Sequence, residues 1–196
     1  LGTFTNVGGL ARNGLAAIDG NGQVTAFNPA IDTPPIAIAA TATTIVVAGF
    51  FSQVGGQARN GLAALDTAGN VLPWAPEPDD AAGQIMFAGN ELIVAGPFSN
   101  IAGQPRAGMA KFDASLALTT WAPAFTNGGG PATPIRMFLA GTDLLAFGGF
   151  DAVNGSPRNE FAQVSIATGA ATALNPPSSF NSVQSMAFDG TTVYLG

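Results

Sequence analysis

A fourfold internal repeat constrains the fold of this chain more than any other feature of its sequence. Residues 4–19 read FTNVGGLARNGLAAID, and closely similar segments occupy residues 51–66, 98–113 and 150–165. Each copy carries an arginine, and successive arginines are 47, 47 and 52 residues apart: Arg12, Arg59, Arg106 and Arg158. Repeats of about 40–50 residues that are built from short strands are typical of propeller blades.

Each repeat predicts four short strands, which we letter a to d in chain order. In the clearest copy they are residues 36–40, 44–49, 61–66 and 70–75, apolar runs bounded by Gly, Asn, Asp and Pro. Sustained helical periodicity is absent from the sequence. We therefore expect an all-β fold, a β-propeller of four-stranded antiparallel blades, with a solenoid of stacked sheets as the alternative.

The repeats also predict how the chain is divided. We expect the c–d hairpin of a split blade at 1–29, blades at 30–76, 77–123 and 124–176, and the a–b hairpin of the split blade at 177–196. Five glycines align as equivalent positions at the end of strand b: Gly2, Gly49, Gly96, Gly148 and Gly196. We expect the chain to be part of a larger repeat protein, with pairing of the two half-blades into a closed ring as the alternative.

The end of strand b carries a family resemblance. An apolar run followed by a glycine pair, clearest at residues 144–149, resembles the repeat of kelch blades. The pattern from G-x-F to N-x-hydrophobic-A-x-x-D is also similar to repeats of fungal cortical-marker propellers and of bacterial secreted propellers. The resemblance implies a propeller of the galactose-oxidase-like superfamily. Phe50 and Pro97 depart from it by replacing the second glycine.

The amino-acid composition excludes several classes of function. The chain has no Cys and no His, which rules out a thiol nucleophile, a Cys/His zinc site and a Ser-His-Asp triad within it. The same absence means that the resemblance implies no copper site of the galactose-oxidase kind. With six basic residues and a net charge of −6, the chain has no basic stripe for nucleic acid.

One segment, residues 33–58, has no charged residue and mimics a membrane span. We interpret it as two strands joined by the turn at 41–44, because the equivalent segments of later repeats carry Glu91 and Asp143. We therefore expect no membrane insertion.

Several repeated residues are candidate binding residues, and each has a structural alternative. The four repeated arginines would line one face of a propeller and hold an anion or glycan, or would instead bond loop carbonyls. Trp74 and Trp121 would stack on sugars, or would instead pack between blades. Phe4, Phe51, Phe98 and Phe150 are expected in the inter-blade core, with a large cost for truncation.

The acidic residues give weaker candidates. Asp19, Asp66 and Asp113 end strand c in three copies, and we expect them to form turns. Asp79 and Asp80 lie in an acidic loop that could hold Ca²⁺ or could simply be solvated. No cofactor is expected.

These observations favour a non-catalytic propeller that is secreted or on the cell surface, with a structural, adhesive or protein-interaction role. Its expected partners are other copies of itself or other blades of a longer chain, together with glycans or surface proteins. A glycan-binding propeller is the first alternative, and a hydrolase that uses carboxylates alone is the second.

Overall fold

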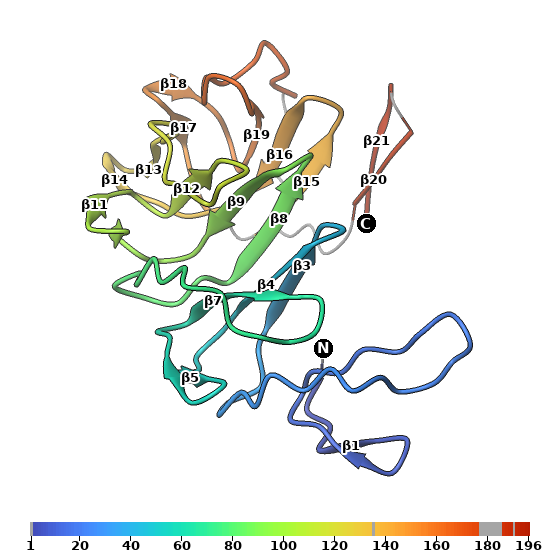
Figure 1. The fold of residues 1–196 in the computed structure, drawn as a ribbon. Coiled ribbons are helices and arrows are strands. Elements are labelled where there is room, and N and C mark those ends of the chain that lie inside the picture. The colour runs from blue at the N-terminus through green and yellow to red at the C-terminus, as the bar shows by residue number, and fades with distance from the viewer. Residues whose placement is uncertain (1, 135, 177–185, 190) are drawn as a thin grey trace.

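The fold is a curved row of small antiparallel sheets (Figure 1). The computed structural model describes residues 2–134, 136–176, 186–189 and 191–196, and none of these residues is helical. Three sheets of three strands correspond to the repeats at 30–76, 77–123 and 124–176, here called the first, second and third repeats. Their strands are β3 (Ala37–Ala40), β4 (Thr44–Ala48) and β7 (Leu62–Asp66); β8 (Gln84–Ala88), β9 (Glu91–Ala95) and β12 (Met109–Phe112); and β15 (Arg136–Ala140), β16 (Asp143–Phe147) and β19 (Phe161–Ser165).

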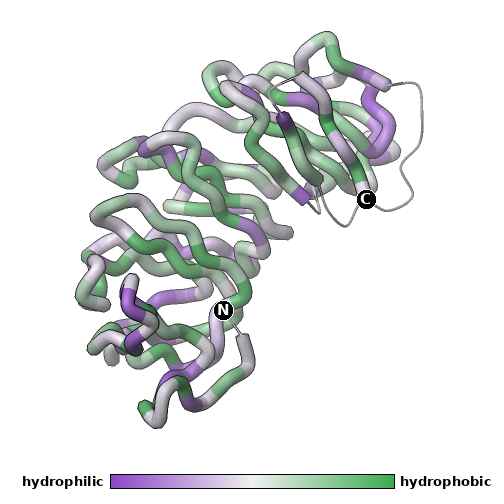
Figure 2. Tube along the Cα trace, turned by 90° about the vertical axis from the view of Figure 1, so that its right-hand side faces the viewer, coloured by the Kyte–Doolittle hydropathy of each residue, from purple (hydrophilic) through white to green (hydrophobic). Residues whose placement is uncertain are grey.

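The sheets stack face to face, and this explains why the strands are apolar along their whole length. The central strand of each sheet, strand b, is buried on both faces; in β9 the residues Leu92–Ala95 are all buried. Strands covered on both sides read as continuous apolar runs rather than as alternating ones. One core lies between the first and second repeats and contains Val46, Leu62, Val94 and Phe112. Figure 2 shows hydrophobic stretches along the stacked strands.

Each loop between strands b and c folds into a two-stranded hairpin that the sequence reasoning did not predict. The hairpin residues are β1 (Asn6–Val7) and β2 (Leu10–Ala11); β5 (Gln53–Val54) and β6 (Gln57–Ala58); β10 (Asn100–Ile101) and β11 (Gln104–Pro105); and β17 (Ala152–Val153) and β18 (Ser156–Pro157). Gly55 and Gly56 both have positive φ, at 59° and 73°, as a two-residue type I′ turn requires. In the third repeat β13 (Phe125–Asn127) and β14 (Gly130–Pro131) extend this hairpin to four strands.

Strand d is not formed as predicted. At residues 70–75 the pairing with strand c is reduced to one bridge, between Leu65 and Val71, and the other repeats show the same single bridge. One residue further on, the Leu72 carbonyl accepts a hydrogen bond from the guanidinium of Arg59. The repeated arginine thus binds the carbonyl that would accept the next hydrogen bond of a longer ladder between strands c and d.

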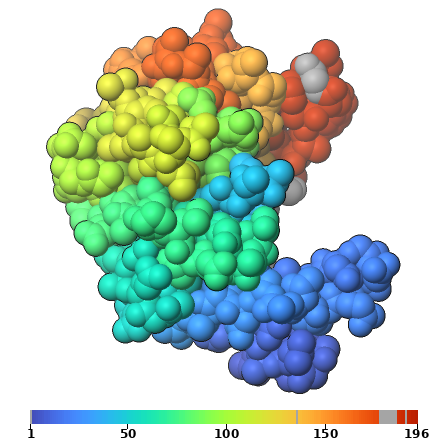
Figure 3. Space-filling view, viewed as in Figure 1, coloured from blue at the N-terminus to red at the C-terminus, as the bar shows by residue number. Residues whose placement is uncertain are grey.

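The two ends of the chain hold half-repeats. Residues 2–29 pack on the first repeat, where Leu15 and Phe27 join its core. The hairpin of β20 (Met186–Phe188) and β21 (Val193–Leu195) packs on the third repeat through Phe138 and Phe161. The predicted a–b hairpin at 177–196 lies partly outside the described residues. Figure 3 shows the first residues, in blue, separated by a gap from the last residues, in red.

The predicted equivalence of Gly196 with the other four glycines is wrong by one residue. In the third repeat Met137 pairs with Ala146, and in the last hairpin Met186 pairs with Leu195, a shift of 49 residues on both strands. Gly196 therefore corresponds to Phe147 and not to Gly148. The side-chain directions agree with this register, because Val193, like its equivalent Leu144, points toward the preceding sheet. A glycine marks the end of a strand only loosely, whereas hairpin pairing fixes its register.

The uncharged segment at 33–58 forms β3 and β4, which confirms the interpretation as two strands. The turn between them is closed by Thr41, whose hydroxyl accepts the backbone N–H of Thr44 at 3.1 Å. No helix long and apolar enough to cross a membrane occurs among the described residues.

Candidate functional site

The four repeated arginines make the same contacts in every repeat. In each copy Nη1 donates to the carbonyl of the preceding residue, and Nη2 donates to a carbonyl 13 or 14 residues further along the chain. For Arg106 these carbonyls belong to Pro105, at 2.7 Å, and Thr119, at 2.6 Å. The guanidinium therefore joins the b–c loop to the segment that follows strand c. We call this arrangement the arginine clamp.

The clamp leaves little of the guanidinium for a ligand. Arg12 is 7% exposed, and the other three are half-buried. The Nε atom of all four is buried and has no hydrogen-bond partner. A buried, unpaired donor costs about 1–3 kcal/mol, which the two carbonyl bonds must offset. The arrangement matches the structural alternative for these residues, although ligand binding by them stays a prediction.

The candidate tryptophans lie between sheets. Trp121 is 5% exposed, and its Nε1 donates to the Ser165 carbonyl of the next repeat at 3.1 Å. Trp74 is half-buried and meets the ring of Phe112, in the next repeat, edge to face at 5.1 Å. Phe27 holds the same place in the first half-repeat and is 4% exposed. Burial against the next repeat leaves no open platform for a sugar at Trp121.

The repeated phenylalanines pack as core residues in the three complete repeats. Phe51, Phe98 and Phe150 are 1 to 2% exposed, and Phe150 meets Phe125 edge to face at 4.8 Å. Phe4, in the first half-repeat, is only half-buried.

The aspartates that end strand c form turns, as the sequence predicts. Asp66 Oδ1 accepts the backbone N–H groups of Ala68 and Asn70, and Asp19 and Asp113 accept equivalent pairs. The side-chain amide of Asn70 and these N–H groups favour the charged form and lower the pKa of Asp66.

A second set of carboxylates binds the b–c loop, a role that the sequence did not predict. Asp32 accepts the N–H and hydroxyl of Ser52, and Asp79 accepts the N–H of Ser99, each 20 residues further on. In the third repeat the two residue types exchange positions. Asp151 is the acceptor there, and Thr126 is the hydroxyl donor, at 3.5 Å. When the repeats are aligned, the acidic residue and the hydroxyl residue exchange positions between the first two repeats and the third. This exchange was the signal available in the sequence.

Asp79 therefore stabilises the b–c loop through hydrogen bonds. Its carboxylate also accepts the N–H and the side-chain amide of Asn100, at 2.9 and 2.8 Å, and these bonds lower its pKa. Asp80 accepts the N–H of Ala81. Across the described part of the chain, no group of three or more acidic side chains is placed to hold a metal ion.

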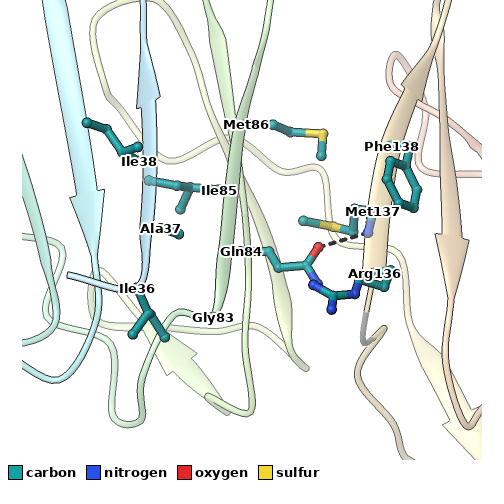
Figure 4. A pocket seen from close by; sticks show the side chains of 10 residues that line it. All are labelled: Ile36, Ala37, Ile38, Gly83, Gln84, Ile85, Met86, Arg136, Met137 and Phe138. Carbon is teal, nitrogen blue, oxygen red and sulfur yellow. Dashed lines mark hydrogen bonds between the residues drawn. The ribbon is translucent and has the colours of Figure 1, made fainter. Parts of the chain in front are cut away.

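The innermost strands β3, β8 and β15 line a hollow of about 370 Å³ (Figure 4). Gln84 crosses it, and its Oε1 accepts the backbone N–H of Met137 at 2.8 Å. Arg136 is exposed at its edge, outside any clamp. Its equivalents in the earlier repeats are Ala37 and Gln84. Arg136 pairs with Phe147, Ala37 with Ala48 and Gln84 with Ala95, and these three partners hold the same position in strand b. Sequence reasoning missed Arg136 because it is not repeated.

Two segments of the chain match a family model. Residues 44–71 and 90–118 match the model described as "Domain of unknown function (DUF5122) beta-propeller". Each segment runs from strand b through the b–c hairpin and strand c to the single strand-d bridge. It contains the clamp arginine, and the second carbonyl of the clamp lies one residue beyond the segment. Among curated proteins, none matches this chain. The all-β stack of repeated sheets and these two matches together support a β-propeller repeat family.

Proposed function

We propose that this protein is a non-catalytic propeller-type scaffold with a structural or protein-interaction role, secreted or at the cell surface. The observation that carries the proposal is the use of the repeated polar side chains within the framework itself. In all four copies the arginine donates to backbone carbonyls, and the repeated aspartates accept backbone N–H groups. Side chains that make their hydrogen bonds to the protein's own backbone stabilise the scaffold and are poorly placed to recognise a small ligand.

The finer family assignment is part of the same proposal. The apolar strand b that ends in glycine, and the sheets that stack around a common hollow, support kelch-like blades of the galactose-oxidase-like type. Few charged residues and a repeated fold support a place outside the cell. Protease treatment of intact cells tests that place, since a surface protein is digested and a cytosolic one is protected.

The proposal is tested against its two alternatives on the purified chain. A glycan array and a panel of glycoside and ester substrates are screened with the wild-type protein and with the Trp74→Ala variant. We expect no saturable glycan binding and no turnover, together with a lower melting temperature for the variant. Saturable binding that Trp74→Ala abolishes, without loss of folding, would establish the glycan-binding function instead.

A further inference from the structure

Five asparagines of the chain are followed directly by glycine, which is the setting in which an asparagine side chain reacts most readily. They are Asn13, Asn21, Asn60, Asn127 and Asn154. In this reaction the main-chain nitrogen of the glycine attacks the side-chain amide carbon, and the approach is open because glycine has no Cβ. The side-chain amide must be free to turn toward that nitrogen. The hydrogen bonds of each side chain therefore decide which of the five asparagines reacts.

Four of the five side-chain amides are held by the fold. They donate to backbone carbonyls at 2.8 to 3.1 Å: Asn13 to Ile31, Asn60 to Pro78, Asn127 to Gly149 and Asn154 to Gly169. Each of these bonds must break before the side chain can turn. One such bond lowers the population of the reactive rotamer by up to about tenfold.

The side chain of Asn21 is not held in this way. It is exposed, and its amide makes no hydrogen bond to the residues that the structure describes. The turn around it is fixed through the main chain, because Asp19 Oδ1 accepts the N–H groups of Asn21 and Gln23 at 2.9 and 2.8 Å. The equivalent turns of the next two copies have Ala68 and Ser115 at this position. Asn21 is thus the asparagine whose amide is free beside a glycine.

We propose that Asn21 is a site of spontaneous deamidation in the folded protein. The Gly22 nitrogen forms a bond to Cγ of Asn21, and the side-chain nitrogen leaves with the Gly22 amide proton as ammonia. Water then opens the resulting cyclic imide at one carbonyl or the other, which gives aspartate or isoaspartate at this position. The Gly22 N–H donates to the Asp19 carbonyl at 3.0 Å, but both residues are exposed, and a turn hydrogen bond of this kind opens readily.

The isoaspartate product weakens the first arginine clamp. Its main chain is longer by one carbon atom, so the N–H of Gln23 no longer lines up with the Asp19 carboxylate. Two residues further on, the carbonyl of Thr25 accepts Nη2 of Arg12 at 2.7 Å. Loosening of the turn therefore reaches the carbonyl that the clamp binds.

Peptide mapping of aged protein tests the proposal. The purified wild-type chain is incubated at mildly alkaline pH for several weeks and digested with chymotrypsin, which separates Asn21 from the other four by cutting after Leu15 and Phe27. Mass spectrometry that resolves aspartate from isoaspartate then measures conversion, with a sample digested before incubation as the background. We expect Asn21 to convert about tenfold faster than any of the other four, because each of those must first release a side-chain hydrogen bond. No conversion of Asn21, or equal conversion of another of the five, would overturn the proposal.

The same incubation in guanidinium chloride is the control for the role of the fold. The unfolded chain keeps every asparagine–glycine pair but none of the hydrogen bonds that hold the side chains, so the five should react at similar rates. A preference for Asn21 that is equally large in the unfolded chain would show that its neighbours in sequence select it, and would refute the structural argument.

The Asn21→Ala variant tests the effect on the clamp. Its turn should form normally, because Ala68 holds the same position in the first complete repeat. Amide hydrogen exchange of residues 22–25 should become faster as the wild type ages and should stay unchanged in Asn21→Ala. Equal exchange in the two aged proteins, after isoaspartate has formed in the wild type, would contradict the loosening of the clamp.

Discussion

The arginine clamp leads to a prediction about stability that can be worked out from its contacts. In the Arg106→Ala variant, the carbonyls of Pro105 and Thr119 lose donors at 2.7 and 2.6 Å. A hydrogen bond to a charged group contributes about 1.5–3 kcal/mol. Because Arg106 is half-buried, water replaces part of each bond, and we expect a loss of about 2–4 kcal/mol in the free energy of unfolding.

The matched control is Arg136→Ala. Both variants remove one guanidinium, so the change in net charge is the same. The Arg136 side chain is exposed and makes no hydrogen bond or ion pair to the residues that the structure describes, and we expect a change within about 0.5 kcal/mol. Arg106→Lys should fall between the two, since an ammonium group cannot present two fixed donors as a planar guanidinium does.

Urea unfolding followed by tryptophan fluorescence, together with thermal melting, measures the difference. For a chain of this length about 1 kcal/mol shifts the melting temperature by about 2–4 °C, so Arg106→Ala should melt about 5–15 °C below the wild type. Equal melting temperatures for Arg106→Ala and Arg136→Ala would refute the reasoning. They would mean that the clamp bonds are worth no more than the water that replaces them.

Three further predictions concern the core, a turn and acid stability. Phe51→Ala should lower the free energy of unfolding by about 3–5 kcal/mol in urea, because Phe51 is 1% exposed, and an unchanged midpoint would contradict its place in the core. Gly61→Ala should cost at least about 1 kcal/mol, since its φ is 68° and a Cβ would lie 2.9 Å from a backbone oxygen; Gly20→Ala, which meets nothing within 4 Å, is the control, and equal midpoints would be the contrary result. The hydrogen bonds from Asn100 lower the pKa of Asp79 in the folded state, so the stability they give is present above about pH 4 and is lost as the pH falls further. Urea midpoints at several pH values should therefore drop less steeply in acid for Asp79→Asn than for the wild type, and parallel curves would show that this carboxylate does not contribute.

The sequence predicted the parts of the fold that depend on apolar runs and turn residues. Strands a, b and c appear within a residue or two of their expected bounds, as in β4 and β7, because each run is closed by Gly or Asp. Strand d was overestimated. The apolar residues at 70–75 suggested a strand, but Arg59 takes the Leu72 carbonyl and Trp74 packs against the next repeat. Such competition between a side chain and a ladder is not visible in local sequence.

The sequence identified the candidate residues but did not predict the contacts that they make. Their recurrence marked Arg12 and its equivalents as important, and only the folded structure shows which carbonyls they bind. The pair of Asp32 and Ser52 and the position of Arg136 depend on which strands lie side by side. A pairing across 20 residues leaves no periodic signal within one repeat. Comparison of the three repeats, position by position, was the information that could have found both.

The short reach of the arginine clamp bears on how the chain folds as it is synthesised. The clamp joins residues that are 13 or 14 positions apart, and the aspartate turn lies inside the same interval. Local contacts of this kind close quickly, because little chain entropy is lost before the first bonds form. Each c–d unit can thus be complete while the next repeat is still emerging from the ribosome. A nascent chain would then grow by adding finished units, and its exposed apolar edge would at any moment be limited to the newest sheet.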